Sequence, residues 1–197
     1  VLDNGATKVR NADHKSKGSM TLTAALAWSR NIVFSKVGLS LGKTTSDAAA
    51  RLYATWLRFG FGGKTGVDVP GESQGLVNDP AERRWRQIDL ANASFGHGVG
   101  TTLMQLAVAY SALVNGGVLV RPRLVESFDG VTIPITVRGT ATTPQVSAQM
   151  IKMTGQVTKS VPLYARLTRI DGYAHGGKSG TAQIWLKEAD GGKGAWD

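Results

Sequence analysis

The most informative part of this sequence is a short segment near its C-terminal end, Gly176-Gly177-Lys178-Ser179-Gly180-Thr181-Ala182-Gln183. It places a lysine and two hydroxyl side chains beside a glycine, directly before the apolar Ile184-Trp185-Leu186. If the segment is an edge strand, its backbone can pair with an extended peptide, Gly180 allows close approach, and the lysine and hydroxyls can hold a carboxylate. A solvated turn is the alternative, and the segment alone leaves both interpretations open.

A second candidate segment lies early in the chain, where Ser29-Arg30-Asn31 separates two expected helices. A hydroxyl and a carboxamide two positions apart can face one cleft, although a serine at a helix end is more often a cap. One class of serine acyl-transfer enzymes combines a hydroxyl-bearing turn of this kind with a lysine-bearing strand. The presence of both segments in one chain therefore favours that chemistry.

Length and composition limit the classes of protein that remain. The chain has 197 residues, 42% of them hydrophobic and 19% charged, which suits one globular domain and contains no apolar run long enough to cross a bilayer. The lack of cysteine excludes thiolate metal sites, disulfides and cysteine nucleophiles. The net charge of +9 favours anionic envelope polymers or a membrane surface as surroundings. Without a basic tail, zinc pattern or helix-turn-helix pattern, no nucleic-acid partner is expected.

The hydrophobic pattern predicts helices early in the chain and strands late. Helices are expected over residues 21–28, 32–38, 45–60, 101–114 and 144–159, and strands over residues 118–125, 131–137 and 173–186. Thr45 or Ser46 is the expected cap of the third helix, and Thr101 or Thr102 with Gln105 that of the fourth, which is apolar on most sides and expected to be buried. The order predicts an α+β domain in which a helical part packs on an antiparallel sheet.

With these motifs in place, the chain resembles the transpeptidase domain of class B penicillin-binding proteins. Ser29-Arg30-Asn31 matches the family's Ser-X-Asn motif, and Lys178-Ser179-Gly180-Thr181-Ala182 matches its Lys-Thr/Ser-Gly-Thr-Ala strand. Glycine-rich blocks over residues 59–72 and 94–117 also resemble the family. The likeness covers nearly the whole chain in the family's order. It implies the penicillin-binding/serine β-lactamase-like fold, with residues 1–197 as part of a single domain that is incomplete at both ends.

The resemblance implies a peptidoglycan D,D-transpeptidase, in which a serine attacks the D-alanyl-D-alanine end of a stem peptide and an amine resolves the acyl-enzyme. It implies a proton relay for Ser29, a bond to the substrate amide for Asn31, and positive potential for Lys178. Substrate binding would fall to the residues of the lysine strand, with the backbone N–H of Thr181 as an oxyanion donor. Those substrate-binding residues are Ser179, Gly180, Thr181 and Gln183. The reaction needs no cofactor and no metal.

The sequence also departs from the family pattern. The family carries its nucleophile in a Ser-X-X-Lys motif before Ser-X-Asn, and residues 1–28 contain no such motif, so the nucleophile is expected upstream of this chain. Ser40-Leu41-Gly42-Lys43 matches literally but follows Ser29, and its glycine indicates a helix end. Lys64-Thr65-Gly66 precedes no long strand and is expected to shape a turn.

The remaining titratable residues have simpler interpretations. His97 is expected to have a structural hydrogen-bonding role rather than that of a general base. His14 and His175 have no further ligands at metal spacing. Asp68, Glu72, Asp79 and Glu82 are expected in a solvated loop and helix start.

The resemblance also implies partners and a location. Expected partners are the D-Ala-D-Ala stem peptide, β-lactams, the upstream part of the same protein carrying Ser-X-X-Lys, and a glycosyltransferase of the cell-wall machinery. The expected location is the extracytoplasmic face of a bacterial membrane, through an N-terminal anchor absent from this chain. Two alternatives remain open: a non-catalytic penicillin-binding sensor or scaffold, and a serine β-lactamase, which the glycine-rich blocks disfavour.

Overall fold

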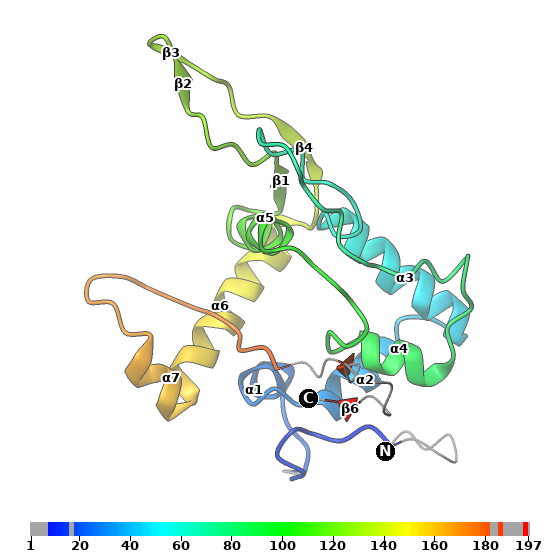
Figure 1. Ribbon diagram of the computed structural model, residues 1–197. Helices are drawn as coiled ribbons and strands as arrows, with labels where there is room; N and C mark the ends of the chain where they lie inside the picture. Colours follow the sequence, from blue (N-terminus) through cyan, green and yellow to red (C-terminus); the bar gives the residue numbers. More distant parts are fainter. Residues whose placement is uncertain (1–7, 16–17, 182–184, 187–194, 197) are drawn as a thin grey trace.

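The computed structural model describes residues 8–15, 18–181, 185–186 and 195–196, which form a helical body with a narrow projecting arm (Figure 1). The helices are α1 Leu22–Ala27, α2 Asn31–Leu39, α3 Thr45–Arg58, α4 Gln87–Ala93, α5 Leu103–Val114, α6 Pro144–Ser160 and α7 Pro162–Leu167. The strands are β1 Val118–Val120, β2 Ser127–Phe128, β3 Val131–Thr132, β4 Val137–Thr140, β5 Trp185–Leu186 and β6 Ala195–Trp196. The described strands form three antiparallel pairs, β1 with β4, β2 with β3 and β5 with β6. The α+β class is confirmed.

Side-chain caps explain where several helices begin. The hydroxyls of Thr21, Thr44 and Thr143 each accept a backbone N–H from the first turn that follows. At α5 the expected capping box is confirmed. The Thr102 hydroxyl accepts from the Gln105 N–H at 3.1 Å, and the Gln105 side-chain oxygen accepts from the Thr102 N–H at 3.0 Å. The cap of α3 expected at Thr45 or Ser46 is wrong, because the Thr44 hydroxyl caps this helix.

Two helices were not predicted. The seven residues of α4 are too few for a clear helical period, and α7 begins at Pro162, which can occupy the first turn of a helix but also breaks the preceding pattern. Together with α2 and α3, α4 forms the largest packed part of the body. Its core members are Ala48, Ala49, Trp85, Leu90 and Ala93, with Val9, Ile88 and Ala91 adjoining.

Close contact between α2 and α4 depends on a glycine. A Cβ atom at Gly38 would lie 1.7 Å from the Ser94 hydroxyl oxygen, so a side chain there would force the helices apart. The buried Ser35 hydroxyl donates to the Ala91 carbonyl at 3.1 Å across the same interface. The end of α2 is thus fixed against α4.

The strands are shorter than predicted, and hydrogen bonds to other segments explain two of the differences. The strand expected over 118–125 ends at Val120, because the Leu124 and Val125 N–H groups donate to the Asp68 carboxylate. The strand expected over 131–137 is divided between β3 and β4. The strand expected over 173–186 is wrong for residues 173–181, where Gly177 N–H donates to the Thr154 carbonyl of α6 at 3.2 Å.

The expectation that α5 is buried on most sides is also wrong. Its buried residues are Gln105, Val108, Ala109 and Ala112, whereas Leu103 is 87% exposed. The same helix leaves Leu106, Tyr110 and Val114 partly open to solvent. None of the helices formed by the described residues is long and apolar enough to cross a membrane.

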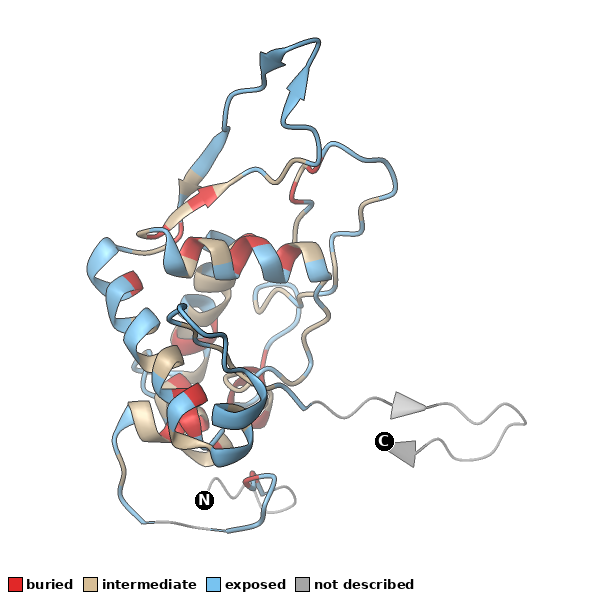
Figure 2. Cartoon of the chain, turned by 90° about the vertical axis from the view of Figure 1, so that its left-hand side faces the viewer, coloured by how far each residue is buried: buried red, intermediate tan, exposed pale blue. Residues whose placement is uncertain are grey.

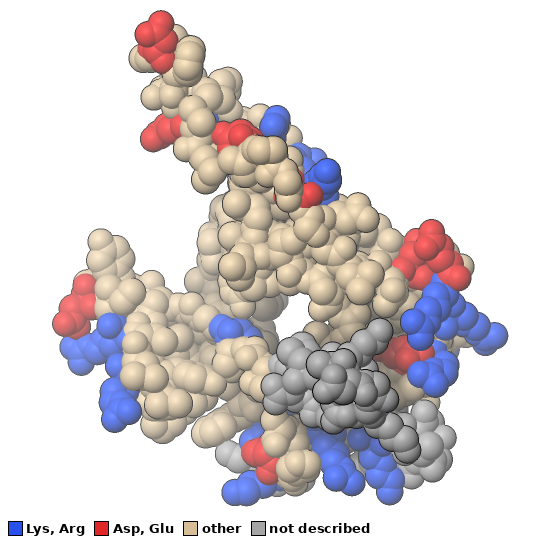
Figure 3. All heavy atoms as spheres, in the orientation of Figure 1, with Lys and Arg blue, Asp and Glu red and all other residues tan. Residues whose placement is uncertain are grey.

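The arm joins β1 to β4 and carries β2 and β3 at its far end (Figure 1). It is exposed along nearly its whole length (Figure 2). Figure 3 shows acidic side chains at the far end of the arm, while most basic side chains on that face lie around the body. Its exposed apolar residues are Leu124, Val125, Phe128, Val131, Ile133, Ile135 and Val137.

Candidate active site

Ser29 occupies a tight left-handed turn between α1 and α2. Its φ is +50°, a conformation that costs a residue with a side chain about 1–2 kcal/mol. The Ser29 N–H donates to the Leu26 carbonyl at 3.1 Å, and the Arg30 N–H donates to the Ala25 carbonyl at 2.9 Å. These two bonds form the Schellman arrangement that ends a helix. The turn therefore stops α1 and leaves Ser29 exposed.

Helix α6 brings Lys178 to this turn. Helix α1 packs directly against α6, as Figure 1 shows, and the segment before Lys178 crosses the same helix. A Cβ atom at Gly176 would lie 2.8 Å from the Gly155 backbone nitrogen, so only glycine allows this crossing. The Lys178 Nζ consequently reaches the Ser29 hydroxyl oxygen at 2.9 Å and donates a hydrogen bond to it.

The surroundings of Lys178 affect its proton affinity. Its Nζ also donates to the Ser179 carbonyl at 2.6 Å and lies 3.4 Å from the Ser179 hydroxyl. The residue is half-buried, and this loss of solvent lowers the pKa of the Lys178 ammonium below its usual value. A lowered pKa makes the Lys178 ammonium a stronger acid than that of a fully solvated lysine, which suits it to proton transfer.

Asn31 is held on a different partner. Its Nδ2 donates to the Arg10 carbonyl at 3.1 Å, so its amide is tied to the segment that runs beneath the turn. The structure thus joins Ser29 and Lys178 by a hydrogen bond, whereas Asn31 begins α2 two positions later and contacts residue 10.

The predicted substrate-binding residues follow Lys178 along an irregular segment. Thr181 is exposed and Ser179 is half-buried. A side chain at Gly180 would meet no heavy atom within 4 Å, so the backbone is open there. Gln183 lies outside the described residues. The segment therefore presents two hydroxyls and an unobstructed backbone beyond the lysine.

The literal Ser-X-X-Lys match at residue 40 forms no Ser–Lys pair. The Ser40 hydroxyl donates to the Val37 carbonyl at 2.8 Å, one turn back in α2. The Lys43 N–H donates to the Asp47 carboxylate at 3.0 Å. Both contacts belong to the end of one helix and the start of the next, which confirms the expected helix end.

The second tripeptide, Lys64-Thr65-Gly66, forms a loop as predicted. The Glu72 carboxylate accepts from the Thr65 N–H at 2.6 Å, from the Gly66 N–H at 2.9 Å, and from the Thr65 hydroxyl. These bonds, led by that of the Thr65 hydroxyl, lower the pKa of Glu72. As expected, both acidic residues, Asp68 and Glu72, lie in this loop, and Asp68 is exposed. Both carboxylates also accept backbone N–H groups, Glu72 within its own loop and Asp68 from Leu124 and Val125 of the arm.

His97 lies against an aromatic ring. Its imidazole packs edge-on against the Phe95 ring, with ring centroids 5.0 Å apart. The backbone N–H of His97 donates to the Asn92 carbonyl. It also lines a pocket of about 530 Å³ with Trp56 and Arg86. Among the described residues, no three His, Asp or Glu side chains gather closely enough to hold a metal ion.

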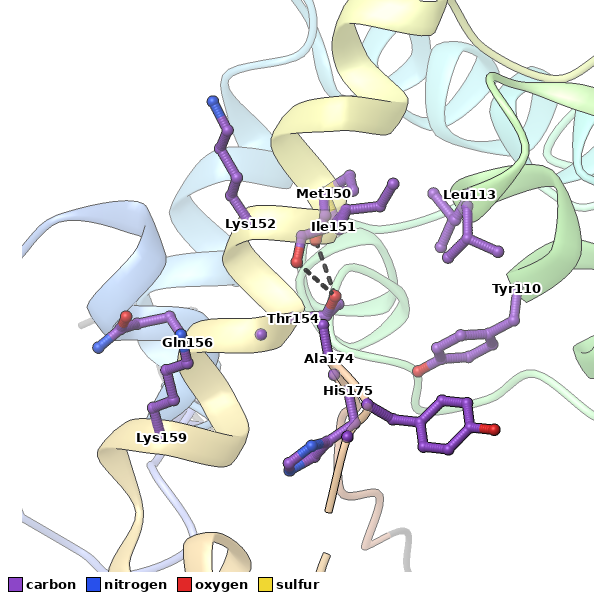
Figure 4. A pocket seen from close by; sticks show the side chains of 15 residues that line it. Tyr110, Leu113, Met150, Ile151, Lys152, Thr154, Gln156, Lys159, Ala174 and His175 are labelled. Atoms are coloured by element: carbon purple, nitrogen blue, oxygen red, sulfur yellow. Dashed lines mark hydrogen bonds between the residues drawn. The ribbon is translucent and has the colours of Figure 1, made fainter. Parts of the chain in front are cut away.

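A cleft of about 1060 Å³ lies between α5, α6 and residues 172–176 (Figure 4). Tyr110 and Leu113 line it from α5, and Met150 and Ile151 from α6. Neither Ser29 nor Lys178 belongs to its lining. The cleft is thus separate from the Lys178–Ser29 pair.

Sequence reasoning missed the residues that support the turn. Asp13 accepts from the Arg30 guanidinium, and Asn11 accepts from the Ile32 N–H. Neither residue belongs to a recognisable motif, and no local signal distinguishes them from other polar residues of the N-terminal segment. Only their contacts across the fold identify them.

The combination of this fold with the two motifs in their order defines a penicillin-binding transpeptidase domain. The family model for the penicillin binding protein transpeptidase domain matches residues 3–196, so the chain belongs to that family. Penicillin-binding protein PbpB of Mycobacterium tuberculosis is 36% identical over 146 residues, which are 68% of this chain and 21% of that protein. Peptidoglycan D,D-transpeptidase FtsI of Escherichia coli is 34% identical over 110 residues, 56% of this chain and 17% of that protein.

Solved structures show the same fold. The transpeptidase domain of Burkholderia pseudomallei penicillin-binding protein 3 superposes with a TM-score of 0.72 at 24% sequence identity, covering 90% of this chain and 49% of that one. The chain spans about a quarter of the length of the first curated relatives, 28% and 21%.

Proposed function

We propose that this chain forms part of the active site of a peptidoglycan D,D-transpeptidase. The observation that carries the proposal is the 2.9 Å hydrogen bond from the Lys178 Nζ to the Ser29 hydroxyl. It joins the family's two motifs across most of the chain length. Membership of the transpeptidase family supports the same conclusion.

In this proposal the Lys178–Ser29 pair moves protons during acyl transfer. The half-buried Lys178 holds positive potential beside the reacting groups, and Ser29 passes a proton between Lys178 and the leaving or entering amine. Asn31 contributes to substrate binding through its side-chain amide, either while it keeps its bond to the Arg10 carbonyl or after that bond breaks. Ser179 and Thr181 bind the terminal carboxylate, Gly180 keeps the backbone accessible, and Gln183 extends the same binding segment.

The serine that forms the acyl-enzyme is supplied, in this proposal, by a Ser-X-X-Lys helix in the part of the same protein that precedes these residues. Ser40 is bonded within its own helix and is a poor nucleophile candidate. The substrates proposed are the D-Ala-D-Ala stem peptide and, as inhibitors, β-lactams. A cell-wall glycosyltransferase is the proposed partner, and the extracytoplasmic face of a bacterial membrane, reached through an upstream anchor, is the proposed location.

Intact-mass spectrometry of the purified protein with and without a penicillin, followed by peptide mapping of the adduct, tests this function. A stable adduct on polypeptide upstream of residue 1 is expected. An adduct on this chain would instead assign the nucleophile to a serine such as Ser40. Absence of any adduct from the intact protein would contradict the transpeptidase and favour a non-catalytic binding module, while rapid loss of the adduct would indicate a β-lactamase.

A further inference from the structure

Arg30, the middle residue of the Ser29-Arg30-Asn31 turn, is bonded through its backbone to two helices. Its N–H donates to Ala25 of α1 at 2.9 Å, and its carbonyl accepts from Val33 and Phe34 of α2 at 3.1 and 3.2 Å. A residue bonded in this way to the end of one helix and the start of the next fixes the angle between them. The position of Ser29, directly before it, depends on that angle.

The side chain of Arg30 is buried inside the protein. Only 3% of it is exposed, and its Nη1 donates to both carboxylate oxygens of Asp13, at 2.7 and 2.8 Å. Within the described residues its buried Nε has no hydrogen-bond partner, so the side chain depends on Asp13. A buried charge that loses its one counter-charge is strongly unfavourable.

Asp13 belongs to a segment, residues 9–15, that is itself anchored. Val9 is buried against Ile88 and Ala91 of α4. The Asn11 side chain accepts from the Ile32 N–H at 3.3 Å, an N–H at the start of α2 that has no partner within the helix, and donates to the Lys15 carbonyl at 2.8 Å.

From these contacts we infer that Asp13 is a positioning residue for the proposed reaction: its ion pair with Arg30 holds the left-handed turn so that Ser29 stays within reach of Lys178. The inference rests on the proposed function. Asp13 touches neither Ser29 nor Lys178 and acts through Arg30. Because a φ of +50° is unfavourable for Ser29, a contact outside the turn adds to the backbone bonds that hold it.

The test measures the second-order rate constant for acylation of the intact protein by a fluorescent penicillin, together with its melting temperature. The rate constant is normalised to the fraction of molecules that can be acylated. A variant that is partly unfolded therefore does not give a falsely low rate constant. Asp13→Asn should slow acylation about 10- to 100-fold, since displacement of a reacting group by about 1 Å can cost on the order of 100-fold. Asp13→Glu, which keeps the charge, should recover part of the rate.

Asp47→Asn is the matched control. Asp13 accepts the Lys15 N–H at 3.0 Å besides its bond to Arg30. Asp47 likewise pairs with an arginine, Arg51, at 3.0 Å and accepts the Lys43 N–H, but it lies on α3. Its substitution should leave the acylation rate unchanged. A rate for Asp13→Asn equal to that of the unsubstituted protein would overturn the inference.

The double variant Asp13→Ala/Arg30→Met separates positioning from stability and carries the test if Asp13→Asn does not fold. Removing both charges leaves no unpaired buried charge, so the melting temperature should recover. The rate should stay low, because the ion pair that ties the turn to residues 9–15 is then missing; recovery of the rate together with the melting temperature would overturn the inference. Failure of the unsubstituted protein to be acylated would contradict the proposed function itself, which is a different outcome.

Discussion

Two tripeptides of one type, Lys64-Thr65-Gly66 and Lys178-Ser179-Gly180, lie in contrasting surroundings. In the first, Thr65 is fully buried and its hydroxyl donates to the Glu72 carboxylate, while the lysine is exposed. In the second, the lysine is half-buried and reaches Ser29, while the glycine faces open space.

The contrast lies in which member of the tripeptide is buried. A buried hydroxyl bonded to a carboxylate stabilises a loop, and its lysine contributes little beyond a solvated charge. A lysine that is partly removed from water beside a second hydroxyl has an altered proton affinity. A lysine–hydroxyl–glycine sequence therefore indicates a site only when another segment packs against its lysine.

The largest expected difference between the two regions is in acylation. Lys178→Ala should lower the acylation rate constant with a fluorescent penicillin about 10³- to 10⁴-fold, because it removes a proton-transfer group and its charge. Lys64→Ala, the matched change in the loop, should leave the rate constant unchanged. Equal effects of the two substitutions would show that the contrast has no functional meaning.

A second substitution tests the partner of Lys178. Ser29→Ala should slow acylation about 10²-fold, since the hydroxyl bonded to Lys178 is lost. Ser40→Ala, which removes a hydroxyl bonded only within α2, should have no effect on the rate.

Ser29→Gly serves as the stability control for that experiment. Glycine adopts positive φ without strain, so this variant should be as stable as the unsubstituted protein or more stable by about 0.5–1 kcal/mol. It should nevertheless acylate as slowly as Ser29→Ala. Normal acylation by Ser29→Gly would assign the role of residue 29 to its backbone.

The loop should respond in stability instead of activity. Thr65→Val removes a buried hydroxyl donor from Glu72 and should cost about 1 kcal/mol, or roughly 2–4 °C in Tm. Thr132→Val, at an exposed position of the arm, should leave Tm unchanged. Thermal unfolding measures both, and a Tm for Thr65→Val equal to that of the control would contradict a structural role for the loop.

The smallest expected effect is the dependence of the loop's stability on pH. Hydrogen bonds from Thr65 and Gly66 lower the pKa of Glu72 below its unfolded value, so the ionised carboxylate stabilises the fold above that value. This contribution is lost as the pH falls below about 4.3 and through the lowered pKa. In denaturant unfolding, the stability difference between the unsubstituted protein and Glu72→Gln should therefore be constant near neutral pH and shrink under acid conditions. A difference that does not change with pH would show that Glu72 is unlinked to folding.

Several features could be predicted from the sequence because they depend on residues close together in the chain. The Thr102–Gln105 capping box and the end of α5 before Asn115-Gly116-Gly117 are contacts within one or two turns. The bounds of α1, α2 and α6 follow the hydrophobic period in the same way. Strand bounds were less predictable, since the partners of Leu124 and Gly177 are Asp68 and Thr154, far away in sequence.

In the candidate site, too, local sequence determined some features and tertiary contacts determined the others. Local residue order alone determined the family motifs at residues 29–31 and 178–182. It set aside the match at residues 40–43 because it follows Ser29 and its glycine indicates a helix end, and the match at residues 64–66 because no long strand follows it. Tertiary structure alone decided that α6 carries Lys178 to Ser29, that Asn31 is tied to Arg10, and that Asp13 neutralises Arg30 beneath the turn. The physical reason is that helix caps and turns depend on neighbouring residues, whereas these contacts depend on how whole helices pack, which no short stretch of sequence contains.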